Sequence, residues 1–453
     1  MPRRVERGCV NEFEGLSREE LVAIILKQRD AILALREEVE DLRSQMGGGR
    51  WSPPPWVKAN RPERKKKDRK KRKKSFFRAR ETPTKTVEHA LDSCPNCGRQ
   101  LEGGTVKWKR QVIDIPIVPI EVTEHVFITR RCGVCGKRFT PKVDLTDEVL
   151  RSHRVGIRLM SLVAYLAIKG RMTKRTIQSF LGAVYGLHLG LGEITNILHT
   201  VAECGREEKE RLLALVRGSP YINADETGWR EDGLNGYIWA FSTKDVRYFA
   251  FRKSRSGEVA REAIGEDYLG TVVTDRYAAY NALLADRQVC WAHILRDLTK
   301  LKERNPDDKE AAAFAEGIKG LYLRAKAVRS KRSQVRRSKR ILLEQELQRL
   351  VTPYIERKCP QRALAYWLSE HISEVFVFVE DPRVPSDNNG AERSLRPAVI
   401  ARKVCGGTRS EKGSETKMTL MSLFGTWSIR NLDPMEACRQ LLMGKSVLFP
   451  APT

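Results

Sequence analysis

The chain has 453 residues, of which 83 are Lys or Arg and 57 are Asp or Glu, so its formal net charge is +26. This length allows about three domains of roughly 150 residues, and a 41% hydrophobic content excludes a wholly disordered or collagen-like protein. The charge indicates a polyanionic partner, because summed positive charge attracts phosphate backbones. The longest apolar run, residues 159–168, is far shorter than the roughly 18 residues of a membrane helix. The N-terminal residues lack the apolar stretch of a signal peptide, so we expect a cytoplasmic protein with reduced cysteines.

Residues 17–46 carry an apolar repeat in alternating steps of four and three, which is typical of a heptad seam. The seam consists of Leu21, Ile25, Gln28, Ile32, Leu35, Val39, Leu42 and Met46. Ser17 and Glu20 form a capping-box pattern at its start, and the glycines at 47–49 end it. We predict a coiled-coil helix within residues 1–50 that makes the protein a homo-oligomer, because a single apolar stripe must be buried against a partner. The alternative is that the stripe folds back onto the chain's own globular part.

Residues 51–88 form a basic linker that we expect to be disordered. Within it, residues 58–80 hold 14 Lys or Arg against only two acids, and apolar residues for a core are lacking. Such arms usually lie along nucleic-acid phosphates, with a solvated linker as the alternative. A second basic stretch, residues 322–340, has nine Lys or Arg and no acid. Two separate basic strips favour nucleic-acid binding.

Four of the ten cysteines fall in two CxxCG pairs, Cys94 with Cys97 and Cys132 with Cys135, with 34 residues between the pairs. Each CxxCG forms a tight knuckle, and two knuckles complete a tetrahedral four-thiolate zinc site without an open position. The segments between them, WKRQVIDIPIV and EVTEHVFITRR, alternate and are β-branched, so we predict a zinc ribbon over residues 89–145. A redox CxxC is less favoured, because nothing resembles a thioredoxin βαβ unit. The other six cysteines are expected to be small apolar fillers.

Residues 146–217 are rich in Leu, Ile and Ala and are predicted to be helical. Within them, residues 173–184 and 192–203 indicate two short helices joined by a glycine-containing turn. The pair is a candidate helix-turn-helix DNA-binding domain. Plain packing of two helices is the alternative.

Beyond Pro220 the pattern changes to strands. The segments YINADETGW, GYIWAFST and VRYFAFRK, a short helix over 257–267 and then GTVVTDRYAAY give β-β-β-α-β, which is the opening of an RNase-H-like sheet. Asp225 follows apolar residues of the first strand, and Asp275 ends the fourth. A lone Asp at a strand end is usually a turn or cap residue. Two on neighbouring strands can instead share the divalent cations that phosphoryl transfer requires.

A third carboxylate should come from a helix that follows a fifth strand. The segment RQVCWAHILRDLTKL is the expected fifth strand and its exit, and a downstream helix that Asp387 or Asn388 can cap carries Glu392. Residues about 296–378 look helical, so we predict a helical insertion within a catalytic domain of residues 218–410, followed by a helical tail at 411–453. The expected fold class is multidomain α/β: an RNase-H-like mixed sheet with a helical insertion, preceded by a coiled coil, a zinc ribbon and a helical domain.

The order of ADETGW, TDRYAAY, CWAH and DNNGAERSLRP resembles the transposases of the insertion sequence 66 family, bacterial enzymes of the DDE class. The heptads, the CPNCG and CGVCGK pairs and the tail SLFGTWSIRNLDPMEACRQLL also match that family's layout, so the resemblance covers nearly the whole chain. One departure follows Lys403, where relatives continue through polar and aromatic residues and this chain has Val404, Cys405, Gly406 and Gly407.

The resemblance implies that Asp225, Asp275 and Glu392 form a metal-binding triad, with Mg²⁺ (or Mn²⁺) as the catalytic ion and Zn²⁺ as a structural one. It also implies that Cys290-x-x-His293 is the motif that follows the fifth strand in related transposases. His293 would support catalysis by positioning a phosphate or donating a proton, and the alternative is a fully hydrogen-bonded histidine at the strand end.

Two further acids lie beside the expected triad. We expect Glu226 not to be a ligand, because it alternates to the opposite face of its strand. Asp387 is expected to stay outside the triad because it precedes the helix.

The function implied is that of an insertion-sequence transposase, which binds terminal inverted repeats, cuts at the ends and joins the 3′ hydroxyls to target DNA. Two alternatives are a non-catalytic zinc-ribbon DNA-binding protein and an RNase-H-like nuclease without strand transfer. The expected partners are element and target DNA, further copies of the chain and accessory proteins of the same element, without a membrane. The expected location is the bacterial cytoplasm, in association with the nucleoid.

Overall fold

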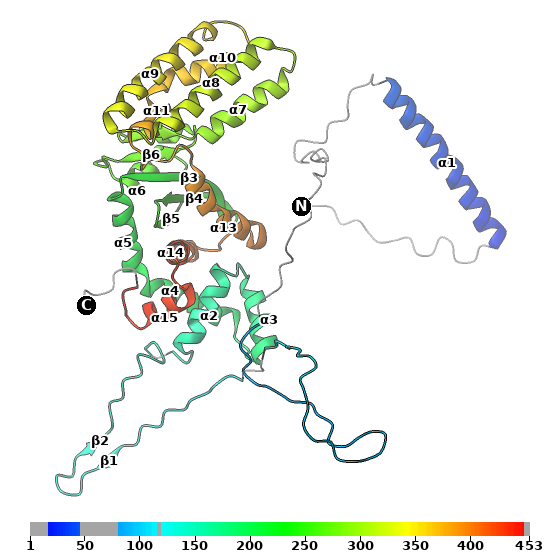
Figure 1. Cartoon of the computed structure of the whole chain (residues 1–453), viewed down its shortest axis with the longest axis vertical. Helices are drawn as coiled ribbons and strands as arrows, with labels where there is room; N and C mark the ends of the chain where they lie inside the picture. The colour runs from blue at the N-terminus through cyan, green and yellow to red at the C-terminus, as the bar shows by residue number, and fades with distance from the viewer. Residues whose placement is uncertain (1–16, 46–79, 116–118, 152, 448–453) are drawn as a thin grey trace. The chain divides into compact units, whose positions relative to one another are not determined.

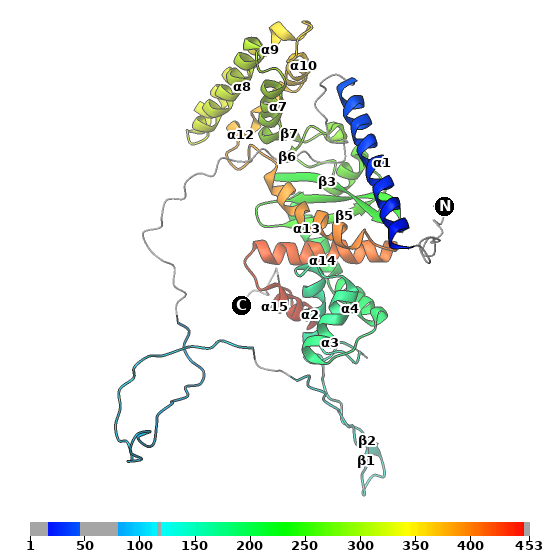
Figure 2. The same ribbon diagram turned by 90° about the vertical axis from the view of Figure 1, so that its right-hand side faces the viewer.

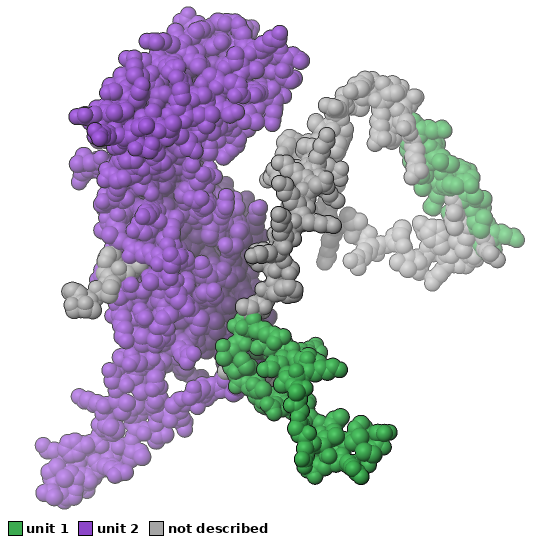
Figure 3. Space-filling view, viewed as in Figure 1, with its two compact units in different colours: residues 1–114 green, residues 115–453 purple. Residues whose placement is uncertain are grey.

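The computed structural model describes residues 17–45, 80–115, 119–151 and 153–447. The chain divides into two compact units, Met1–Asp114 and Ile115–Thr453 (Figure 3). The predicted basic linker lies outside the described residues up to position 79, and so does the end of the tail from 448. None of the helices in the described ranges is long and apolar enough to cross a membrane.

Helix α1, Arg18–Gln45, begins with the predicted capping box. The backbone N–H of Ser17 donates to the Glu20 carboxylate at 2.7 Å, and the N–H of Glu20 donates to Ser17 Oγ at 3.3 Å. The hydrogen bond from the Ser17 backbone is the main reason why the pKa of Glu20 lies below its usual value. The helix is therefore confirmed. Its pairing with a second copy stays a prediction, and Ile32 and Leu35 of the seam are exposed in the single chain.

The long strands predicted between the cysteine pairs are mostly wrong. Residues 108–115 and 121–129 form no strand, and the pairing observed in this part of the described chain joins the two-residue strands β1 (Arg130–Arg131) and β2 (Arg138–Phe139). Alternation of apolar and polar residues does not by itself make a strand, because each strand needs a neighbour that takes its backbone hydrogen bonds.

The predicted helical region consists of four helices. They are α2 (Ile157–Ile168), α3 (Lys174–Tyr185), α4 (Leu191–Cys204) and α5 (Arg206–Arg217). The candidate helix-turn-helix corresponds to α3 and α4, and the hydroxyl of Thr173 caps α3 by accepting from the Thr176 N–H at 3.1 Å. Met160 of α2 and Val201 of α4 are fully buried in a core shared with one face of the sheet. The two helices are confirmed, and their contact with DNA stays a prediction.

A five-stranded mixed sheet lies between helices α2–α4 and helices α7–α10 (Figures 1 and 2). Its strands are β3 (Tyr221–Glu231), β4 (Leu234–Ser242), β5 (Arg247–Arg252), β6 (Thr271–Thr274) and β7 (Asp286–Val289). The spatial order is β5-β4-β3-β6-β7, in which β3, β4 and β5 are antiparallel and β6 is parallel to both β3 and β7. Helix α6, Gly257–Ile264, joins β5 to β6. The predicted strand succession and the mixed α/β class are confirmed.

Alternation along β3 sends consecutive side chains to opposite faces of the sheet. Ala240 lies opposite Asp225 in the register and packs in the core beneath helix α13, Asn389–Cys405. Trp239 lies opposite Glu226 and packs in the other core, which the sheet shares with α2–α5. Asp225 therefore lies on the α13 face, and Glu226 lies on the opposite face, as predicted.

A helical insertion follows β7, as predicted for residues about 296–378. It contains α7 (Trp291–Arg304), α8 (Lys309–Val328), α9 (Ser333–Val351), α10 (Arg362–Glu370), α11 (Ile372–Val375) and α12 (Val377–Glu380). These helices share a core with Val273 of β6 and Val289 of β7. The insertion is thus packed directly on the edge of the sheet that lies next to Asp275.

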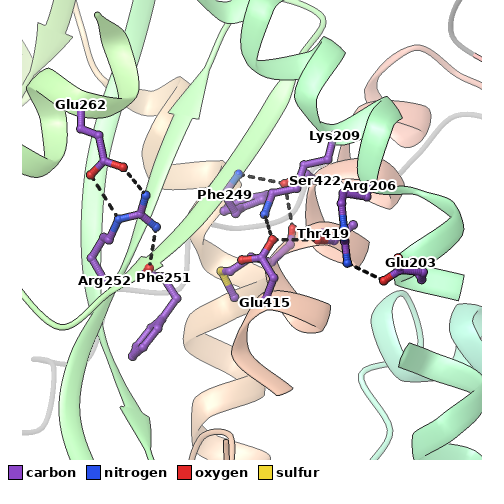
Figure 4. A network of polar contacts seen from close by, with 11 residues as sticks. Glu203, Arg206, Lys209, Phe249, Phe251, Arg252, Glu262, Glu415, Thr419 and Ser422 are labelled. Carbon is purple, nitrogen blue, oxygen red and sulfur yellow. Dashed lines mark hydrogen bonds and ion pairs between the residues drawn. The ribbon is translucent and has the colours of Figure 1, made fainter. Parts of the chain in front are cut away.

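Helix α14, Glu411–Ile429, covers the edge strand β5, and α15, Pro434–Leu442, packs behind it. Ser422 Oγ accepts a hydrogen bond from the Phe249 N–H at 2.9 Å (Figure 4), and Thr426 Oγ1 accepts one from the Arg247 N–H at 3.0 Å. A free edge would leave these N–H groups unpaired. The departure after Lys403 supplies the end of α13, because Gly406 takes the left-handed conformation there.

Candidate functional site

The two predicted aspartates lie at the same level of the sheet. Strands β3 and β6 are parallel. Residues 221–223 of β3 each pair with the residue of β6 that lies 50 positions further along the chain, so that Asn223 pairs with Val273. The same offset brings Asp275, directly after β6, level with Asp225. Strand order and register thus place the two aspartates on neighbouring strands at the same end of the sheet.

The electrostatics of Asp225 reflect an accumulation of negative charge. Burial first, and then the charges of Glu226, Asp275 and Glu392, together raise the pKa of Asp225 to about 7, against one hydrogen bond from the Glu226 N–H at 2.9 Å. A carboxyl group surrounded by three other acids is the environment that a divalent cation neutralises.

The loop after β6 holds Asp275 in place. Its Oδ1 accepts a hydrogen bond from the Tyr277 N–H at 2.9 Å. The neighbouring Arg276 forms an ion pair with Asp297 and lies over the ring of Trp367, 4.9 Å from its centroid. Arg276 is thus engaged with the helical insertion instead of neutralising the aspartates.

Asn388, at the start of α13, ties that helix to the sheet. Its side chain donates to the Ala224 carbonyl at 2.7 Å and accepts from Asn223 Nδ2 at 3.0 Å, and both asparagines are buried. Its backbone N–H donates to Cys290 Sγ at 3.1 Å. Helix α13 therefore begins at a point fixed by β3 and by the start of α7, and Glu392 lies in its first turn.

Glu392 lies next to both residues of the CxxH motif. The ligand atoms of Cys290, His293 and Glu392 all lie within 4.8 Å of one another, and among the described residues neither aspartate belongs to such a group. Arg296 approaches the Glu392 carboxylate at 3.9 Å. Nδ1 of His293 is buried and has no hydrogen-bond partner in the described part of the chain. Within the described residues, His293 is therefore not the fully hydrogen-bonded histidine of the alternative.

The two further acids have other partners. Glu226 is almost fully buried, with its carboxylate bound to Arg255 at 2.6 Å and to the hydroxyl of Tyr280 at 2.6 Å. Asp387 accepts a hydrogen bond from the Asn389 N–H at 3.1 Å, in a turn that precedes α13. Both acids thus have partners within the described chain, and that they are not metal ligands stays a prediction.

The sequence alone missed Asn223 and the structural role of Asn388. Asn388 stands in the DNNGAER motif, and its closeness to Glu392 was a usable signal. Asn223 carries no local signal, because its partner lies 165 positions away. Cys290 is buried as expected for an apolar filler, and it also accepts the hydrogen bond that holds the loop before α13.

The two CxxCG segments have the same local geometry. In the first, the Cys94 N–H donates to the Arg99 carbonyl at 2.8 Å, and the Gly98 N–H donates back to Cys94 at 2.8 Å. In the second, the Cys132 N–H donates to Lys137 at 2.8 Å, and the Gly136 N–H donates to Cys132 at 3.0 Å. Backbone N–H donors lower the pKa of both leading thiols. Each knuckle is thus formed locally, and their union at one ion stays a prediction.

Comparison with known proteins gives one family. The family model described as "Transposase IS66 family" matches residues 153–416. The uncharacterized protein y4jD of Sinorhizobium fredii strain NGR234 is 25% identical over 296 residues, which cover 57% of this chain and 56% of that protein. The uncharacterized protein y4qI of the same organism is 25% identical over 275 residues, covering 53% and 50%. The chain spans about half the length of the curated relatives it matches.

Proposed function

This chain belongs to the IS66 family of transposases, and from that premise we propose that it is a DDE-class enzyme that binds the ends of its element, cuts there and joins the 3′ hydroxyls to target DNA. The observation that carries the proposal is the convergence of Asp225 on β3, Asp275 directly after the parallel strand β6, and Glu392 in the first turn of α13, whose start is hydrogen-bonded to β3. Three acids from β3, the end of β6 and α13 influence one another across the sheet, although they are far apart in the sequence. Structural acids are usually paired with bases, whereas the charges of Asp275 and Glu392 act on Asp225.

The strand order and connections support an RNase-H-like sheet. Three antiparallel strands, a helix and two further parallel strands place β3 beside β6, so that an acid from each faces the same region. The helical insertion after β7 and the return of the chain as α13 then supply the third acid. In this proposal, the insertion and the motif DNNGAER serve to place Glu392 opposite the two aspartates.

The residues present fit a divalent cation, because hard carboxylate oxygens dominate the site. Asp225, Asp275 and Glu392 would hold Mg²⁺ (or Mn²⁺), which when bound activates the attacking oxygen and stabilises charge on the leaving oxygen. The protein's own contribution is to hold the carboxylates in place: Tyr277 N–H orients Asp275, and Asn388 fixes the start of α13. His293 would bind a phosphate oxygen or donate a proton.

The other parts of the chain would bind DNA and hold the assembly together. Four thiolates, from Cys94, Cys97, Cys132 and Cys135, would hold a structural Zn²⁺, which fits the two preformed knuckles. Helix α1 would join copies of the chain through its seam, and α3 and α4 would contact the element ends. Accessory proteins of the same element would complete the machinery.

The test is a Mg²⁺-dependent cleavage and strand-transfer assay on DNA that carries the terminal repeats. Wild type is expected to give joined product, while Asp225→Asn and Glu392→Gln give none and still bind the ends. Asp286→Asn is the matched control, because this exposed acid lies at the opposite end of β7 from the site. Joined product from Asp225→Asn would refute the assignment of the triad.

A further inference from the structure

A cavity of about 320 Å³ lies on another side of α13, between the end of α2, strand β5 and helix α14. Its wall contains five cations, and no Asp or Glu is among the described residues that line it. The cations are Lys169, Arg171, Arg247, Arg393 and Lys417. They come from four separate elements of the fold, so their gathering is a product of the tertiary structure.

Arg247 is the innermost guanidinium of this group. Its Nη1 donates to the carbonyls of Thr243 and Val246 at 2.6 and 2.8 Å, which fixes the head group in place. Its Nε and Nη2 have no hydrogen-bond partner within the described ranges. Burial and, after it, the positive charge of Arg393 together lower the pKa of Arg247 to about 10, against smaller opposite effects of Tyr221 and Asp245. Two like charges thus line one cavity, and no acid is among its described lining residues.

Lys417 and Lys169 add to this excess. Burial lowers the pKa of the Lys417 ammonium, and no carboxylate of the described chain lies within ion-pair distance of it. Lys169 donates to Ser428 Oγ at 2.8 Å, which holds it at the rim. The rest of the wall includes the buried apolar side chains of Phe249 and Met421, which exclude water and strengthen electrostatic attraction inside the cavity.

Unneutralised cations held at the wall of a half-apolar cavity are costly unless an anion joins them. A phosphodiester fits, because its oxygens accept from guanidinium and ammonium groups at once. Arg393 directly follows Glu392 on α13, so the cavity and the third acid share one helix.

We propose that this cavity binds a backbone phosphate of a DNA strand, contacted by Arg247, Arg393 and Lys417. The inference rests on the proposed function, since it requires DNA to be the substrate. Helix α13 would then have a second function, because it would bind the DNA strand on a face different from the one that carries Glu392.

The experiment measures binding of a fluorescein-labelled duplex to the full chain in EDTA at several salt concentrations, so that cleavage plays no part. Each phosphate contact contributes about 0.9 to the slope of log K against log salt. Lys417→Met and Arg393→Gln are each expected to reduce the slope by about 0.9, and the double variant to reduce it no further, because both changes remove the same phosphate. Lys412→Met is the matched control, because Lys412 lies on α14, as Lys417 does, but outside the cavity.

Unchanged slopes in both single variants, or additive losses in the double variant, would overturn the inference and leave the proposed function intact. Absence of any DNA binding by wild type would defeat the proposed function and the inference together. Titration with inorganic phosphate and with AMP tests whether the cavity binds a free anion instead of a DNA phosphate. If Lys417→Met abolishes binding of these free anions but leaves the salt slope of DNA binding unaltered, the cavity is a site for free anions and the DNA assignment is refuted. Arg393 is exposed, so Arg393→Gln tests the inference even where Lys417→Met alters folding.

Discussion

The buried side chain of Asn223 donates a hydrogen bond from Nδ2 to Oδ1 of Asn388, which is also buried, at 3.0 Å. The pair joins the first strand of the sheet to the start of the helix that carries Glu392. It therefore couples the position of one acid to the strand that carries Asp225.

Replacement of Asn388 by Ala should loosen this junction. The change removes the Asn388 partner of the buried Ala224 carbonyl and leaves the Asn223 amide with only a long contact, 3.5 Å, to the Asp387 carbonyl, which costs about 1–3 kcal/mol for each weakened group. Metal affinity should also fall, by about 10- to 100-fold, as expected when a group that orients a ligand is lost. Chemical denaturation and calorimetric Mn²⁺ binding measure the two effects. Asn389→Ala is the control, and equal behaviour of the two variants would contradict the assigned role.

Gly390 should not tolerate a side chain. A Cβ at this position would lie 2.7 Å from Oδ1 and 3.0 Å from Cγ of Asn223, which its hydrogen bond to Asn388 holds in place. Gly390→Ala is therefore expected to lower the melting temperature and to suppress strand transfer. Gly320→Ala is the matched control, because nothing lies within 4 Å of a Cβ there and helix α8 should gain up to about 1 kcal/mol. A Gly390→Ala protein as stable and active as Gly320→Ala would rule out the close approach.

Cation binding should depend on pH through Asp225. Because its pKa is raised to about 7, the carboxyl group keeps its proton up to neutrality, and a cation must displace that proton. Affinity for Mn²⁺ should rise by about tenfold per pH unit below pH 7 and level off above it. Calorimetry in two buffers with different ionisation enthalpies counts the released proton. Affinity that does not change between pH 5.5 and 7.5 would contradict this linkage.

The same pKa shift has a consequence for the metal-free protein. The pKa of this carboxyl group is higher in the folded protein than in the unfolded chain, where it is about 3.9. Such a group stabilises the fold fully at pH values below about 3.9. This contribution is lost as the pH rises through about 7. In EDTA, Asp225→Asn should gain in free energy of unfolding relative to wild type from pH 4 to pH 8, while Asp286→Asn follows wild type.

Zinc content tests the pairing of the two knuckles. One Zn²⁺ per chain is expected, because a structural site needs all four thiolates. Cys94→Ser and Cys132→Ser should each abolish it, as measured by elemental analysis of the purified protein. Cys405→Ser is the control, since Cys405 is exposed and lies at the end of α13. Loss of zinc in only one of the two knuckle variants would exclude a shared ion.

The sequence by itself determined the features that depend on neighbouring residues. The capping box of α1, the two CxxCG turns and the succession of strands and helices from Tyr221 to α7 are local patterns, because helix and strand periods and turn hydrogen bonds involve residues a few positions apart. The positions of Asp225 and Glu226 on opposite faces followed from the same two-residue period. The family was recognised from the motifs that these elements carry. The strands predicted over 108–115 and 121–129 are wrong, because their alternation has no partner strand to make it structure.

Only the tertiary structure decided what lies across the sheet and around α13. The bond between Asn223 and Asn388, the closeness of Glu392 to Cys290 and His293, and the effect of Asp275 and Glu392 on the pKa of Asp225 all depend on how elements 50 or more residues apart pack together. The cavity with five cations depends on four elements at once. Such contacts cannot be predicted from a local sequence pattern, because they are determined by side-chain packing and burial. The period of a helix or strand shows which of its faces is apolar, but not which distant element that face packs against.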